Sequence, residues 1–150
     1  PGQIGELAIS GPQIMDGYLE SEEETKLVLE SGWLHTGDIA RMDEDGYFYI
    51  IGRKKELIKV GGLQVWPNEI EEVIRQIPGI NDCAAKGIPD DELGEVVKVW
   101  VVAGNNVNIT LDIIQRYCAD KLAAYKIPKQ LAIIDALPRS FIGKLLRYRL

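Results

Sequence analysis

Residues 49–65 read YIIGRKKELIKVGGLQV, and this stretch sets the organisation of the chain. Its second half holds two short apolar segments on either side of Gly61-Gly62. Paired glycines between such segments predict a tight β-hairpin. The basic run at 52–55 comes directly before this hairpin and after another apolar segment. We therefore expect the boundary between two structural units to lie at this basic run.

The charge of the chain changes at the same boundary. Residues 1–51 hold 11 acidic and 2 basic side chains, a balance of −9, whereas residues 52–150 hold 12 acidic and 15 basic ones, a balance of +3. The total of −6 argues against nonspecific binding to nucleic acid. The basic second part is nevertheless suited to an anionic ligand.

The order of the expected elements predicts the fold class. In the first part these elements are a strand at 6–10, a helix that Ser21 caps and Gly32 ends, and a hairpin of strands 37–42 and 47–51. In the second part they are the hairpin strands 57–60 and 63–65, a helix from Pro67 to residue 77, strands 80–88 and 95–102, a helix from Thr110 to about residue 123, and a strand at 131–134. This order predicts an α+β fold, in which a β-rich remnant precedes a small α+β domain.

The composition is typical of a globular protein, which we expect to be cytoplasmic. Apolar residues make up 46% of the chain and charged residues 27%, and neither a run of about 18 apolar residues nor a signal-peptide pattern occurs. Cys83 and Cys118 lie in apolar stretches without metal spacing, so we expect buried, reduced thiols and no metal site. Because the sequence begins at Pro1 without Met, we expect a piece of a longer protein.

Asp38 and Arg53 are candidate binding residues. Asp38 follows a glycine at the expected start of a strand, and its carboxylate could accept hydrogen bonds from two vicinal hydroxyls, as on a ribose. Arg53 follows the returning strand, which brings it to the same end of the hairpin. Taken alone, Asp38 is more typical of a turn or a cap, and the two residues could form a simple ion pair.

Lys144 is the candidate catalytic residue. It follows Gly143 on a short tail, and its ammonium is a compact charge that can meet a phosphate and a carboxylate together. Gly143-Lys144 lacks the following Ser or Thr and the preceding spaced glycine of a phosphate-binding P-loop. Elsewhere, Gly61-Gly62 is a turn whose bare backbone would also let a thin ligand pass close by. Lysines 54, 55 and 59 would ordinarily be solvated, and His35 has no nucleophile arrangement around it that would suggest a catalytic triad.

Taken in order, these segments resemble the adenylate-forming superfamily, which includes acyl-CoA synthetases, coumarate-CoA ligases, firefly luciferase and the adenylation domains of nonribosomal peptide synthetases. The resemblance covers essentially the whole chain. The segments that carry it are residues 5–19, 32–38, 49–59 with Gly61-Gly62 and 67–71, 125–128, and 138–144.

The resemblance implies a role for each candidate residue. Asp38 and Arg53 would bind the ribose of ATP and of the acyl-adenylate, and Lys144 would act on the α-phosphate and the substrate carboxylate. Lys55 would be the hinge, within 53–56, about which a C-terminal lid pivots. After the pivot, Gly61 and Gly62 would line the path of the pantetheine arm, with Lys59 as a weaker candidate in that second pose.

The implied parent is an ATP-dependent carboxylate–CoA ligase that forms an acyl-adenylate and then an acyl-CoA thioester. Residues 1–51 would end its large AMP-binding domain, and 52–150 would form the mobile lid. The expected partners are ATP/AMP, coenzyme A, the carboxylic acid, Mg²⁺ bound with the N-terminal domain, and that domain itself. The phosphate loop and the acyl pocket of the family are missing from this sequence, so we expect the isolated chain to be inactive. A carrier-protein phosphopantetheine as acceptor, and a non-catalytic interaction module, stay open as alternatives.

Overall fold

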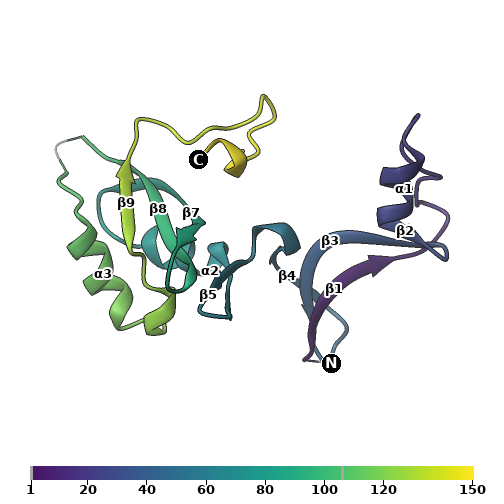
Figure 1. Ribbon diagram of the computed structural model, residues 1–150, viewed down its shortest axis with the longest axis horizontal. Coiled ribbons are helices and arrows are strands. Elements are labelled where there is room, and N and C mark those ends of the chain that lie inside the picture. The colour runs from purple at the N-terminus through teal and green to yellow at the C-terminus, as the bar shows by residue number, and fades with distance from the viewer. Residues whose placement is uncertain (1, 106) are drawn as a thin grey trace. The chain divides into compact units, whose positions relative to one another are not determined.

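The computed structural model describes residues 2–105 and 107–150, which fall into two compact units that divide between Lys55 and Glu56 (Figure 1). Each unit has its own β-sheet. No helix among the described residues is long and apolar enough to cross a membrane.

The first unit is built on the long strand β3, and its elements are β1 (Ile4–Ile9), α1 (Glu22–Val28), β2 (Leu29–Glu30), β3 (Trp33–Met42) and β4 (Phe48–Arg53). Strand β1 pairs antiparallel with β3 along most of its length. Strand β2 pairs with the start of β3 and β4 with its end, both antiparallel. The sheet therefore consists of two hairpins that share β3, with β1 added along the same strand from earlier in the chain.

Helix α1 is shorter than the sequence predicted. It ends at Val28, not at Gly32, because Leu29 and Glu30 leave the helix to pair with β3. The turn between the two strands uses positive φ at Ser31 (52°) and Gly32 (82°), so the glycine serves a hairpin and not a helix end. Ser21 occupies the N-cap position as predicted, but its side chain makes no capping hydrogen bond.

The second unit contains a mixed sheet in the order β6-β5-β8-β7, with β9 parallel to β8. Its strands are β5 (Ile58–Val60), β6 (Leu63–Val65), β7 (Ile80–Asp90), β8 (Gly94–Ala103) and β9 (Gln130–Ile133). The predicted loop before Gly94 is only a short turn, because β7 continues through Pro89 to Asp90 in register with β8. The predicted glycine hairpin is present as β5–β6.

The helical elements of the second unit are α2 (Pro67–Ile74), α3 (Leu111–Ala119) and the short 3₁₀ turns η1 (Lys54–Glu56, across the division), η2 (Ala124–Lys126) and η3 (Arg147–Arg149). Helix α2 begins at Pro67 as predicted and ends before residue 77, because the backbone tightens into i to i−3 hydrogen bonds at Gln76 and Ile77. Helix α3 ends earlier than predicted for the same reason, since the Lys121 amide bonds Cys118.

The core of the second unit lies between the sheet and the two helices. It joins buried side chains of β5 to β8 with those of α2 and α3, among them Val65, Ile70, Ile74, Val99 and Ile114. Cys83 and Cys118 are both unbridged and buried in this core, as the sequence predicted. Burial raises the pKa of the Cys83 thiol to about 12, so this thiol stays protonated at neutral pH.

Candidate functional site

Asp38 and Arg53 lie directly opposite each other in the register of β3 and β4. The Arg53 Nε lies 2.8 Å from Asp38 Oδ1, which makes an ion pair. Asp38 is not at the start of a strand, as the sequence suggested, but in the middle of β3, because that strand begins at Trp33 to pair with β2. The predicted proximity of the two residues is confirmed.

The backbone around Asp38 holds the pair in place. Gly37 has a φ of +70°, where a larger residue would be strained, and the register of β1 on β3 shifts beside it. The Thr36 hydroxyl donates to the Leu7 carbonyl and accepts the Asp38 amide, while Arg53 Nη1 donates to the Thr36 carbonyl. The Asp38 side chain is 24% exposed, so a fixed carboxylate still faces solvent and can accept further hydrogen bonds.

Carboxylates surround the single histidine. His35 Nδ1 lies 3.8 Å from Glu6 Oε2, and its Nε2 lies 3.8 Å from Glu30 Oε2. Lys54, expected to be solvated, donates to the same Glu6 oxygen at 2.8 Å. The hydrogen bond and the charge of Lys54 hold the pKa of Glu6 below its usual value, so Glu6 is an anion that tethers the end of β4 to β1.

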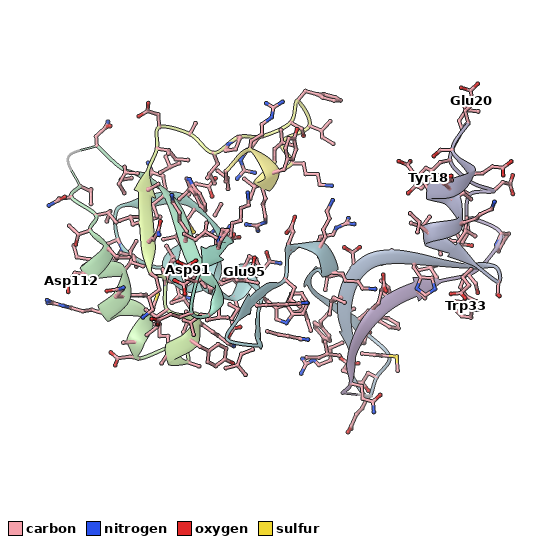
Figure 2. The ribbon with its side chains drawn as sticks, in the orientation of Figure 1. Tyr18, Glu20, Trp33, Asp91, Glu95 and Asp112 are labelled. Carbon is pink, nitrogen blue, oxygen red and sulfur yellow. The ribbon has the colours of Figure 1, made fainter. Side chains whose placement is uncertain are left out.

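The β5–β6 hairpin brings together Lys59, Gly61 and Gly62. Both glycines have positive φ, 55° and 82°, which explains why the turn uses them. The Gly61 amide donates to the Leu93 carbonyl at 2.8 Å, and the Lys59 amide donates to Glu95, labelled in Figure 2, at 2.7 Å. The hairpin is thus fixed to the turn between β7 and β8, while the Lys59 side chain is exposed.

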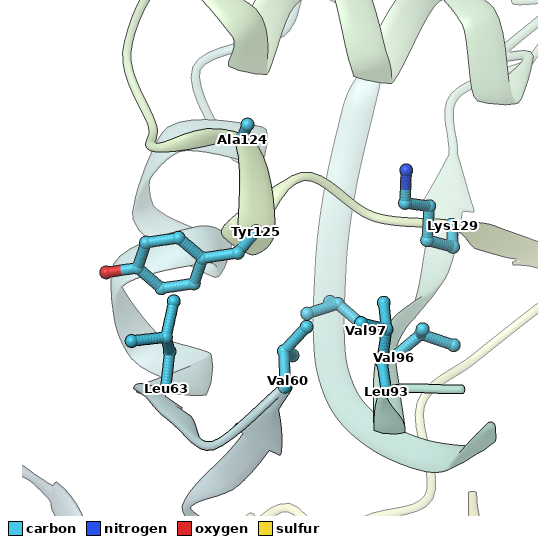
Figure 3. Close-up of a pocket in the computed structure, with 9 residues that line it drawn as sticks. Val60, Leu63, Leu93, Val96, Val97, Ala124, Tyr125 and Lys129 are labelled. Atoms are coloured by element: carbon cyan, nitrogen blue, oxygen red, sulfur yellow. The ribbon is translucent and has the colours of Figure 1, made fainter. Parts of the chain in front are cut away.

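A pocket of about 380 Å³ lies behind this hairpin, and sequence reasoning did not anticipate it. Figure 3 shows the Tyr125 ring over Leu63 at one side and Lys129 at the other. The remaining lining is aliphatic, from Val60, Leu93, Val96 and Val97, apart from Gly61 and Ala124. A local pattern of apolar residues cannot predict such a pocket, because its walls come from segments far apart in the sequence.

Lys144 lies on a tight turn of the C-terminal tail, which is the segment that follows β9. The Ser140 amide donates to the Lys144 carbonyl at 2.8 Å, and the Lys144 amide donates to the Ser140 hydroxyl at 3.1 Å. Gly143, with a φ of +83°, closes the turn. Lys144 itself is exposed, and no ion pair is found for it within the described residues.

Two arginines hold the tail to the rest of the second unit, and sequence reasoning missed both contacts. Arg139 Nη2 lies 2.6 Å from Asp82 Oδ2 on β7. Arg147 bonds both oxygens of Glu71, the Ala85 carbonyl and Glu56. Glu71 is only 2% exposed although it is charged. Only the charge itself, on an otherwise apolar helix face, could have signalled a buried partner.

The Arg147 guanidinium is kept charged by its acidic neighbours. Burial lowers its pKa, but the hydrogen bond and charge of Glu71, together with Glu56, outweigh that effect and raise the pKa above its ordinary value. The tail is therefore held by a permanent charge pair in a largely desolvated place.

Comparison with known proteins identifies the class. Residues 69–144, half of the chain, match the family model of the AMP-binding enzyme C-terminal domain, and the chain belongs to this family. The resemblance to adenylate-forming enzymes is thus confirmed.

Particular relatives agree with the family. The chain is 46% identical over its whole length to a long-chain-fatty-acid–CoA ligase of Escherichia coli O6:H1, and it covers 27% of that protein. It superposes with a TM-score of 0.94 and 35% identity on ATP-bound MatB from Rhodopseudomonas palustris, over 99% of this chain and 30% of that one. The o-succinylbenzoate CoA synthetase of Bacillus subtilis, in complex with its acyl-adenylate, gives a TM-score of 0.91 at 32% identity over 99% of this chain and 30% of that one. The chain spans about a quarter of the length of the curated relatives that it matches.

Proposed function

We propose that this chain forms part of an ATP-dependent carboxylate–CoA ligase, which makes an acyl-adenylate and then an acyl-CoA thioester. The observation that carries the proposal is the likeness to acyl-CoA ligases across both units, at 46% identity over all 150 residues. The related structures with ATP and with an acyl-adenylate support the first half-reaction. In this proposal, residues 1–51 end the large AMP-binding domain and 52–150 form the lid.

Asp38 and Arg53 bind the nucleotide sugar. The carboxylate is fixed by Arg53 and by its neighbours on β3, yet it stays partly exposed, which suits it to accept two vicinal hydroxyls. Arg53 holds that carboxylate in one orientation through their 2.8 Å ion pair. No deformation of the sheet is needed to form the site, because the pair already exists.

Lys144 stabilises the charge that builds up when the acid attacks the α-phosphate. Its ammonium is exposed on a braced turn, so it can enter a site formed by another part of the enzyme. A well-placed donor in a site that excludes water contributes roughly 2.7–4 kcal/mol to the transition state. Lys144 thus holds two anions, the phosphate and the carboxylate, against each other.

Lys55 is the hinge about which the lid turns between the two half-reactions. The tail docks on β7 at Asp82 and Ala85, whereas the glycine hairpin docks at Leu93, the opposite end of the β7–β8 hairpin. A rotation at one backbone position can therefore replace the tail by the glycine hairpin at the active site. In the second pose Gly61, Gly62 and Lys59 lie along the pantetheine arm.

The acceptor is CoA, and a long-chain fatty acid is the first acid to test, since the curated relative acts on that class. A carrier-protein phosphopantetheine is the alternative acceptor, because both share the pantetheine arm. The Mg²⁺ of this proposal binds together with ATP in the N-terminal domain of the parent protein. The cytoplasm, where ATP and CoA are available, is the proposed compartment.

The test compares the two half-reactions in the whole parent protein. Lys144→Ala should abolish acid-dependent ATP–pyrophosphate exchange and spare thioester formation from supplied acyl-AMP. Lys121→Ala, which removes another exposed lysine of the second unit, should leave both unchanged. Equal loss of both half-reactions in Lys144→Ala would remove the assigned role. A parent without exchange for any acid would favour the interaction module instead.

A further inference from the structure

The turn that carries Lys144 is held by a side chain just before it. Arg139 donates through Nη1 to the Gly143 carbonyl at 2.8 Å and through Nη2 to Asp82 Oδ2 at 2.6 Å. One guanidinium thus bonds the turn from inside and ties it to β7. The fork geometry of arginine makes both bonds possible at once, which a lysine ammonium could not reproduce.

Asp82 is itself a fixed anchor. Its Oδ1 accepts the Cys83 amide at 2.9 Å, and the carboxylate is 28% exposed. It sits beside the register shift that separates Ile80 from Asp82 in β7. The acceptor for Arg139 is therefore part of the sheet and not a mobile surface group.

Asp82 also belongs to a row of side chains with alternating charge. Arg75 Nε lies 4.0 Å from Asp82 Oδ1, and Arg75 Nη2 lies 3.2 Å from Glu71 Oε2. Glu71 bonds Arg147, and Arg147 bonds Glu56 at 2.9 Å. The same network therefore holds the tail before and after Lys144 and ends one residue beyond the proposed hinge. A side chain already held by one partner loses less freedom when it meets a second.

We infer that Arg139 is a positioning residue for Lys144, which acts through Asp82 and the Gly143 carbonyl to fix the lysine for adenylation. This inference rests on the proposed function. Arg139 itself touches no substrate. The network makes the lysine turn move with the lid as one body, so the lid's rotation brings Lys144 to one defined place.

The test uses Arg139→Ala and Asp82→Asn in the whole parent protein. Asn at 82 keeps an oxygen for the Cys83 amide and removes only the charge that Arg139 needs. Both variants should lower the rate constant of adenylation by about ten- to a hundredfold, since a displacement of about 1 Å costs that much. KM for ATP and for the acid should change less than twofold, and thioester formation from supplied acyl-AMP should not change.

Three further variants separate positioning from other roles. Arg139→Lys should give an intermediate rate, and Arg139→Ala/Asp82→Asn should be no slower than Arg139→Ala alone, because both act through one contact. Arg149→Ala is the control: Arg149 lies in the same tail, is exposed, and its guanidinium lies over the Tyr148 ring, 5.7 Å from the ring centroid. The Arg149→Ala variant should have the same adenylation rate constant as the unaltered protein.

Each outcome has one meaning. A large loss in Arg139→Ala with none in Asp82→Asn would show that Arg139 does not act through Asp82 and would overturn the inference. Equal losses in both half-reactions would indicate general damage to the lid and would also overturn it. If exchange depends on Lys144 but is unaffected in both variants, the inference fails and the proposed function stands. If the unaltered parent shows no exchange, both fail.

Discussion

The two units bury their apolar side chains to very different extents. In the second unit, one continuous core joins both helices to the sheet, and several of its members are fully inaccessible. In the described part of the first unit, the buried apolar residues are Ile39 and Ala40, whereas Ile4, Phe48 and Ile50 are more than half exposed. The contrast teaches that hydrogen-bonded hairpins alone do not make a self-sufficient fold, since burial supplies most of the driving force.

The largest expected effect comes from separating the units. Residues 56–150 should fold alone, with a cooperative thermal transition, because their core lies entirely within them. Residues 1–55 should lack such a transition, since the exposed apolar face of their sheet has nothing to pack on. Circular dichroism melting of the two peptides checks this. A cooperative transition in 1–55 would break the comparison.

The charged pairs of the two units should also differ. Glu71→Ala should destabilise the second unit by about 3–5 kcal/mol, because it leaves Arg147 charged and buried without its main partner. Asp38→Ala should cost the first unit less than about 1 kcal/mol, since the Arg53 side chain is 43% exposed and stays hydrated. Denaturant unfolding of the 150-residue chain, followed by Trp fluorescence, measures both costs as changes in the free energy of unfolding of the whole chain. Similar costs for both would refute the distinction.

Alkaline pH should lower the stability of the second unit, because both cysteines lie in that unit and the Cys83 thiol is deeply buried. Its pKa is raised from 9.0 to about 12, so the folded state favours the neutral thiol. This contribution to stability is complete below pH 9 and is lost as the pH rises toward 12, by about 1.4 kcal/mol at pH 10. The stability gap between the unaltered chain and Cys83→Ala should therefore narrow from pH 8 to pH 10. A constant gap would contradict the raised pKa.

The smallest difference concerns the two helix caps. The Thr110 hydroxyl accepts the Ile113 amide at 3.3 Å, so Thr110→Ala should cost the second unit about 1 kcal/mol. The Ser21 side chain makes no capping bond, so Ser21→Ala should change the stability of the first unit by less than about 0.5 kcal/mol. The same denaturant titration detects both. A larger cost at Ser21 would reveal a cap that the structure does not contain.

Local pattern predicted most elements, and strand pairing explains where the structure differs from that prediction. Pro67 and the cap at Thr110 predicted where the two helices of the second unit begin, and the structure confirms both starts. The end of α1 was wrong because Leu29 is claimed by a strand that lies later in the chain. That strand is β3, which pairs with Leu29 and Glu30 through a tight turn at Ser31 and Gly32, and the helical pattern before Gly32 did not reveal this turn.

The candidate site divides in the same way. The Asp38–Arg53 pair followed from two neighbouring strands and was predictable, although the position of Asp38 within β3 was not. The functional roles of these residues and of Lys144 stay predictions. The Arg147–Glu71 contact joins residues 76 positions apart, and nothing nearby in the sequence pairs them.

This last separation bears on how the protein is synthesised. Arg147 leaves the ribosome 91 residues after Glu56 and 76 after Glu71, when α2 and the β7–β8 hairpin have already emerged. Until then, the Glu71 carboxylate has only the more exposed Arg75 as a cationic partner, so its burial is costly. The second unit should therefore complete its native packing only after Arg147 has emerged. A ribosome that pauses before Arg147 has emerged would hold a nascent chain whose helix α2 is not yet fixed to the sheet by this contact.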